Sequence, residues 1–151
     1  MLTLDQPEQV FQSSDLSRHA TRVFAAAEVH PVEVTRRDGE DLVLMSKSEA
    51  SARKSLLQLA STLIGVATDT RGTLSERMAD ALPWMLALTT EDREACAGEL
   101  LAAARASFST GQAHLAVAAL NSWLETATAV AAGLGAEPIE WLDQGVDVER
   151  P

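Results

Sequence analysis

Cationic and hydroxyl side chains are concentrated in residues 13–22, which read Ser-Ser-Asp-Leu-Ser-Arg-His-Ala-Thr-Arg. Arg18 and Arg22 lie four residues apart, so on a helix they share one face. Hydroxyl groups at a helix N-terminus, together with two arginines, can hold phosphate groups, and arginine can also read a guanine edge. From spacing alone, a solvent-exposed helix face with ordinary serine caps is the commoner explanation. The segment is therefore a candidate phosphate-binding site with a purely structural alternative.

A second pair of basic residues, Arg36-Arg37, lies at the tip of a predicted hairpin. Residues 32–37 alternate between apolar and polar side chains, which indicates a half-buried strand. Residues 42–45 are continuously apolar, which predicts a strand covered on both faces. The turn is expected at residues 37–40, because Asp38-Gly39 is typical of tight hairpin turns. The basic tip can contact phosphate or can simply keep the sheet edge soluble.

The elements around these residues predict an α+β N-terminal domain. Residues 8–12 can form a short edge strand, and Ser13 or Ser14 can cap a short helix that runs to about residue 21. Residues 22–29 continue this helix or form a second one, which must end before Pro31. We expect these short helices to pack on one face of a small antiparallel sheet.

Over residues 10–50, this order of elements resembles the N-terminal domain of the Phd/YefM (prevent-host-death) antitoxins, and the string Thr-Arg-Arg-Asp-Gly-Glu at 35–40 is its most recognisable part. The resemblance implies a dimer that represses its own operon and neutralises a toxin by direct binding. It implies operator contacts by Ser13, Ser17, Arg18, Arg22 and Arg36, and a fold and dimer core built from Val32, Val34, Leu42 and Leu44.

From Ser46 onward the chain is predicted to be all helix. Apolar residues at three- and four-residue spacings form a core-facing stripe, and Thr73 with Glu76 fits a capping box. Pro83 must kink or restart the following helix. Two more helices are expected at about 89–108 and 112–132, followed by an acidic tail over 138–151 that is loosely attached or orders on a partner. The first stripe comprises Leu56, Leu59, Leu63 and Val66, and the last helix carries Val117, Leu120, Leu124 and Ala127 on one side.

We therefore divide the chain into residues 1–50, for dimerisation and DNA binding, and residues 51–151, for toxin binding. Within the second part, residues 82–101 followed by 121–127 look like the helical extension of some longer members of the same family. Large apolar side chains are often the strongest contributors to protein interfaces, although tryptophan is also a common core residue. The predicted toxin contacts are Trp84, Leu86, Trp123 and Trp141.

Enzyme chemistry is not expected. His19, His30 and His114 have no metal-ligand spacing to one another or to Cys96, and the chain holds no glycine-rich phosphate loop or nucleophile elbow. Cys96 is predicted to be a buried, small apolar residue. The sequence therefore predicts no catalytic residue, metal, cofactor or small-molecule substrate.

The net charge of −10 limits the kinds of partner. Residues 1–50 hold five Arg and Lys against nine Asp and Glu, and residues 51–151 hold seven against thirteen. An acidic protein does not coat nucleic acid nonspecifically, so DNA binding requires a local basic patch, doubled by dimerisation. No N-terminal signal and no membrane-spanning apolar run is visible, which predicts a cytoplasmic location and no membrane contact.

The sequence thus predicts an antitoxin of a type II toxin–antitoxin module that is also the repressor of its own operon. The alternative is a helical protein-interaction scaffold, an orphan antitoxin-like protein that does not bind DNA.

Overall fold

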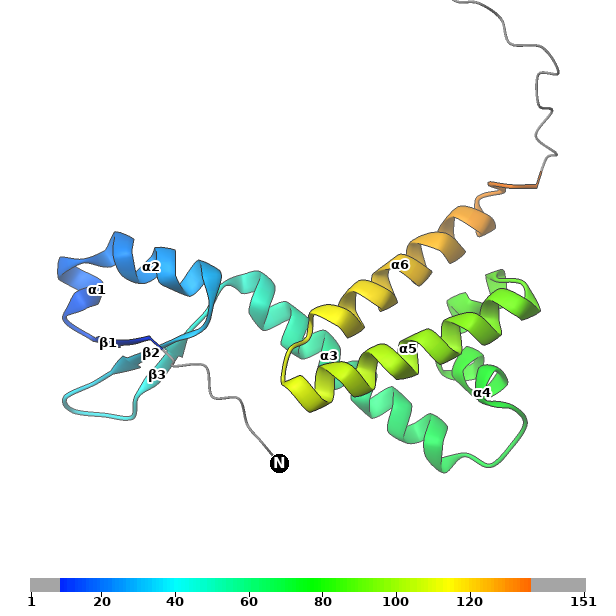
Figure 1. Cartoon of the computed structure of the whole chain (residues 1–151), viewed down its shortest axis with the longest axis horizontal. Helices are drawn as coiled ribbons and strands as arrows, with labels where there is room; N and C mark the ends of the chain where they lie inside the picture. Colours follow the sequence, from blue (N-terminus) through cyan, green and yellow to red (C-terminus); the bar gives the residue numbers. More distant parts are fainter. Residues whose placement is uncertain (1–8, 137–151) are drawn as a thin grey trace, which may run out of the picture.

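The computed structural model describes residues 9–136, which form an α+β arrangement (Figure 1). Three short strands, β1 (Val10–Gln12), β2 (Val32–Thr35) and β3 (Leu42–Leu44), form one sheet in the order β1-β2-β3. β1 pairs with β2 in parallel, and β2 pairs with β3 antiparallel. The predicted antiparallel sheet is therefore wrong in part. The sheet is mixed, because the chain returns through two helices before β2 instead of through a hairpin.

Two short helices connect β1 to β2. α1 (Asp15–Arg18) and α2 (Ala20–Val29) are separated at His19, whose backbone leaves the helical region (φ −136°, ψ 38°). Residues 22–29 thus belong to a second helix, and this helix ends before Pro31 as predicted. Ser14 occupies the N-cap position of α1, but its side chain makes no capping hydrogen bond.

The predicted hairpin is present, with β2 and β3 joined by residues 36–41. Val32 and Val34 are only 1% and 2% exposed, which confirms the alternating pattern of β2. The prediction that the second strand is covered on both faces is wrong, because Leu42 and Val43 are 52% and 54% exposed. Val43 pairs with Glu33 and lies on the face of the sheet opposite the buried valines. Leu42 pairs with Val34 on the edge strand β3, where its side chain is left exposed.

A small core joins the helices to one face of this sheet. Its members come from β1, α2 and β2, with partly buried side chains from α1, α2 and β3 around them. The buried residues are Phe11, Val23, Ala27 and Val32, and those packed against them are Leu16, Ala26 and Leu44.

The rest of the described chain is helical, and its first helix leads away from the sheet (Figure 1). α3 (Lys47–Thr68) begins at Ser46, whose hydroxyl accepts the N–H of Glu49 at 3.1 Å. The predicted division after residue 50 therefore falls inside the first turns of α3. α4 (Leu74–Ala81) begins with the predicted capping box, and η1 (Pro83–Ala87) is a 3₁₀-helix that restarts the chain at Pro83.

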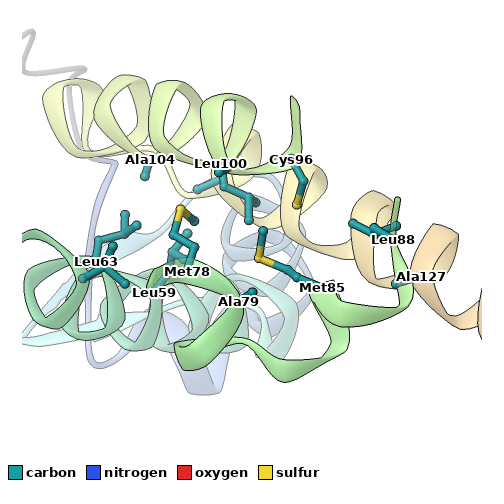
Figure 2. Close-up of a cluster of buried hydrophobic side chains, with 13 residues drawn as sticks. Leu59, Leu63, Met78, Ala79, Met85, Leu88, Cys96, Leu100, Ala104 and Ala127 are labelled. Atoms are coloured by element: carbon teal, nitrogen blue, oxygen red, sulfur yellow. The ribbon is translucent and has the colours of Figure 1, made fainter. Parts of the chain in front are cut away.

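α5 (Thr90–Thr110) and α6 (His114–Ala131) complete this helical half. Gly111, at the end of α5, has a φ of 67°, a left-handed conformation that glycine adopts without strain. A larger core fills the space between the helices, with Met78 and Met85 from α4 and η1 facing Leu100 and Cys96 of α5 (Figure 2). Leu59, Leu63 and Val66 of the predicted α3 stripe are buried in it.

The last helix differs in part from its prediction. Ala127 is buried and Leu120 packs partly against the core, as predicted, whereas Leu124 is 40% exposed. The buried side also carries Ala116, with Trp123 partly buried. No helix within residues 9–136 is long and apolar enough to cross a bilayer.

Candidate nucleic-acid and partner interfaces

The ends of β1 and β2 bring Ser13 and Arg36 to the same edge of the sheet. The two strands are parallel, so their carboxyl ends meet there. The N–H of Ser13 donates to the carbonyl of Thr35 at 2.9 Å, and the hydroxyl of Thr35 donates to the carbonyl of Phe11 at 3.2 Å. Arg36 directly follows Thr35. Two predicted DNA contacts that lie 23 residues apart in the sequence are thereby held close together.

Arg18 and Arg22 lie beside this edge, on α1 and α2. The guanidinium carbon of Arg22 lies 5.6 Å from the centroid of the Phe11 ring, a cation–π distance that fixes the side chain against β1. Both arginines are exposed. Because the chain breaks at His19, they belong to two helices and not to the single helical face that their spacing predicts.

Two carboxylates that are close to these arginines in the sequence accept hydrogen bonds from backbone groups. Asp15 accepts the N–H of Gln12, and Asp41 accepts the N–H of Arg36, each at 2.9 Å. Within residues 9–136, no carboxylate lies within ion-pair distance of Arg18, Arg22 or Arg36. These two carboxylates close the loops and make the local electrostatic potential less positive. They do not occupy the N–H donors of the arginines, which therefore stay available to an external anion.

The hydroxyl groups add polar contacts at the same place. Ser13, Ser14 and Ser17 are all exposed. Arg36 folds back on its own loop, since a Cβ at Gly39 would lie 3.0 Å from its guanidinium carbon. We call the group Ser13, Ser17, Arg18, Arg22 and Arg36 the arginine corner. It has the chemistry of a phosphate-binding surface.

The hairpin residues assigned to the dimer core divide into two kinds. Val32 and Val34 are buried inside the single chain, and Leu44 packs partly against the same core. Leu42 and its neighbour Val43 are exposed on β3, which is an edge strand of the sheet. An exposed apolar edge strand is able to pair with another strand.

The predicted toxin contacts within the described residues differ in exposure. Trp84 is partly buried against the helical core, whereas Leu86 is 60% exposed. Trp123 packs against the core and donates its indole N–H to Glu99 at 2.8 Å. Trp141 lies outside the described residues.

The structure also forms a groove that the sequence does not predict. It has a volume of about 230 Å³ and lies between α3, the α4–η1 junction and α6. We call it the α3–α6 groove. Its apolar walls come from all three elements, its polar lining is uncharged, and it shares only Trp84 with the predicted toxin contacts. The lining comprises Ser55, Gln58, Leu59, Thr62, Leu82, Trp84, Leu120, Asn121 and Leu124. In the sequence, the groove is indicated only by the i, i+4 pair Leu120 and Leu124. This spacing is equally typical of a helix face that packs into the core, which is the prediction that the periodicity gives.

The histidines and the cysteine take no part in a common site. His19 and His30 are exposed at the two ends of α2, and His114 is exposed at the start of α6. Within residues 9–136, no three His, Cys, Asp or Glu side chains lie where they could hold a metal ion. Cys96 is fully buried, as predicted, and burial raises the pKa of its thiol to about 11.

Comparisons with known proteins do not assign a family to this chain. No protein-family model, no curated protein and no solved structure matches it.

Proposed function

We propose that this protein is the antitoxin of a type II toxin–antitoxin module, similar to the Phd/YefM proteins. Two chains pair through the β2–β3 hairpin and bind operator DNA, and the helical half binds and blocks the toxin. The protein acts in the cytoplasm without catalysis or a cofactor.

The observation that carries the proposal is the arginine corner. Three exposed arginines and two serine hydroxyls lie at one end of the sheet, and the adjacent Asp15 and Asp41 are hydrogen-bonded to backbone amides. Each arginine can give a charge-assisted hydrogen bond to a phosphate oxygen. One corner offers few cations against the net charge of −10, so a dimer is required to present two corners at once.

The exposed edge strand supports the dimer. Leu42 and Val43 leave apolar surface on β3, and among residues 9–136 no further strand pairs with the outer side of β3. Pairing of two such edges would cover this apolar surface and relate the two arginine corners by a two-fold axis. A palindromic operator has the matching symmetry.

The helical half supports the second activity. It has its own core, and it displays the exposed Leu86 and the partly buried Trp84. An antitoxin needs such a surface to cover the active site of a small toxin.

Binding to the DNA upstream of the gene tests the proposal. A mobility-shift titration over a range of salt concentrations should give a log–log slope of about −0.9 per phosphate neutralised. The double variant Arg18→Ala with Arg22→Ala should abolish the shift, while Arg105→Ala, an exposed arginine of α5, should leave it intact. Loss of binding in both variants, with folding unchanged, would contradict the assignment of the corner.

The alternative is a protein-interaction scaffold without DNA binding. The acidic net charge favours it, because the phosphate backbone repels such a surface. The scaffold function would be supported if the purified dimer gives no mobility shift with upstream DNA at low salt and still binds the protein encoded by the adjacent gene.

A further inference from the structure

We infer that the α3–α6 groove is the docking site of the chain's own C-terminal segment, residues 139–143, which read Ile-Glu-Trp-Leu-Asp. The inference does not depend on the proposed antitoxin function. It assigns an intramolecular occupant to an apolar groove that the described residues leave open to solvent.

The groove is built for an apolar side chain. Leu59 forms its buried wall, and Leu82, Trp84 and Leu120 surround it as partly buried side chains. Leu124 lies at its rim and is 40% exposed. Filling the groove removes this apolar surface from water, which is favourable through the hydrophobic effect. The segment offers Trp141 and Leu142 side by side, with Ile139 two residues before them.

The charges of the two surfaces are complementary. No carboxylate lines the groove, and the nearest charged position on α3 is Lys54, one helical turn before the lining residue Gln58. Lys54 is exposed and has no ion-pair partner within residues 9–136. In the tail, Glu140 and Asp143 flank the apolar pair, so a docked tail brings carboxylates to this lysine.

The chain is long enough to return to the groove. Leu124 lies about 10 Å of helix before the end of α6 at Ala131, and the six residues from Ala136 to Leu142 span about 20 Å when extended. Ala131 is seven residues after Leu124, so it lies on nearly the same face of α6. A tail that runs back along this face therefore reaches the groove without strain.

α6 ends in a turn that allows the chain to change direction after the helix. Gly133 has a φ of 92°, and the N–H groups of Gly133 and Leu134 donate to the carbonyls of Val130 and Ala129. These two bonds form a Schellman motif, which ends the helix and turns the chain off its axis. The helix axis of α6 therefore does not continue beyond this turn.

Disulfide trapping in the full-length protein tests the inference. One variant combines Leu124→Cys with Leu142→Cys, and the matched control combines Ser122→Cys with Leu142→Cys. Ser122 is exposed, lies at nearly the same height on α6, and points to the opposite side, because two residues correspond to about 200° of helix rotation. The native Cys96 is fully buried and does not compete.

Under mild oxidation, we expect the Leu124→Cys pair to close within one chain at least about tenfold faster than the control, independently of protein concentration. Adding Trp141→Ala should remove this advantage, while adding Val148→Ala should not. Circular dichroism establishes that each variant is folded. Equal rates for the two pairs would overturn the inference, and so would trapping only as a covalent dimer, which would make a second copy the occupant.

Discussion

The hydroxyl of Ser107 accepts a hydrogen bond from the backbone N–H of Ala116 at 3.0 Å, and both residues are completely buried. α6 begins after Ala113, which has no side-chain group that could cap the helix. Ser107 belongs to α5, so the preceding helix supplies the hydrogen bond that a capping residue would ordinarily make. This contact joins α5 to the first turn of α6, the helix that carries one wall of the groove.

Replacing this serine should therefore weaken the fold. Ser107→Ala leaves the buried N–H of Ala116 without a partner, and we expect the free energy of unfolding to fall by about 1–3 kcal/mol. Urea denaturation followed by circular dichroism measures the loss. Ser122→Ala, which removes an exposed hydroxyl from α6, should change stability by less than about 0.5 kcal/mol. Equal effects in the two variants would contradict the assigned role of Ser107.

A second stabilising contact joins α3 to α4. The guanidinium of Arg77 donates to the carbonyl of Val66 at 3.0 Å and to that of Gly72 at 2.8 Å, near the end of α3 and in the connecting turn. Arg77→Met keeps the apolar stem and loses these charge-assisted bonds, so we expect a loss of about 1.5–3 kcal/mol in chemical denaturation. Arg105→Met is the control, and a loss of the same size there would refute the explanation.

The proposed dimer predicts a specific response to a charge on β3. In Leu42→Lys, a cation replaces exposed apolar surface at the edge strand, so two edges repel each other while the monomer stays folded. Sedimentation velocity should show a shift from dimer to monomer. Leu57→Lys changes a similarly exposed leucine on α3 and should remain dimeric. A dimer that persists in Leu42→Lys would place the interface elsewhere.

Acid should destabilise the protein through Glu76 among other carboxylates. The N–H of Thr73 donates to Glu76 at 2.7 Å and lowers the pKa of its carboxyl, and a side-chain hydrogen bond from Arg71 likewise lowers the pKa of Asp69. A lowered folded-state pKa stabilises the fold above the unfolded-state pKa of about 4, and this stabilisation is lost as pH falls further. Thermal unfolding from pH 7 to pH 3 should thus show a smaller loss of melting temperature for Glu76→Gln than for the parent. Glu94→Gln changes an exposed carboxylate and should lose as much melting temperature between pH 7 and pH 3 as the parent protein. An equal loss in Glu76→Gln would contradict a contribution of the Glu76 carboxylate to acid destabilisation.

The buried thiol predicts slow chemical modification. Burial raises the pKa of Cys96 to about 11, so little thiolate forms at pH 8 and the reagent has no access. We expect a disulfide reagent to react at least about a hundredfold more slowly with the native protein than with the protein in urea. Comparable rates in both conditions would show that Cys96 is accessible in the native state.

The sequence by itself determined the local elements, because their signals lie within a few neighbouring residues. Pro31 ends α2, the Thr73–Glu76 capping box starts α4, and Pro83 restarts the chain as η1. The alternation of Val32 and Val34 fixed which face of β2 is buried. Each of these outcomes follows from backbone sterics, local hydrogen bonds or side-chain period.

Only the tertiary structure decided which apolar residues are covered and which distant residues meet. Leu42 and Leu124 have the same local signals as core residues, yet both are exposed, because burial depends on whether another element reaches them. The parallel pairing of β1 with β2 brings Ser13 next to Thr35, and this contact assembles the arginine corner. The two residues are far apart in the sequence, so no local sequence pattern predicts that they meet. Strand order and helix packing are long-range choices, so the corner and the α3–α6 groove emerge only when the whole chain is folded.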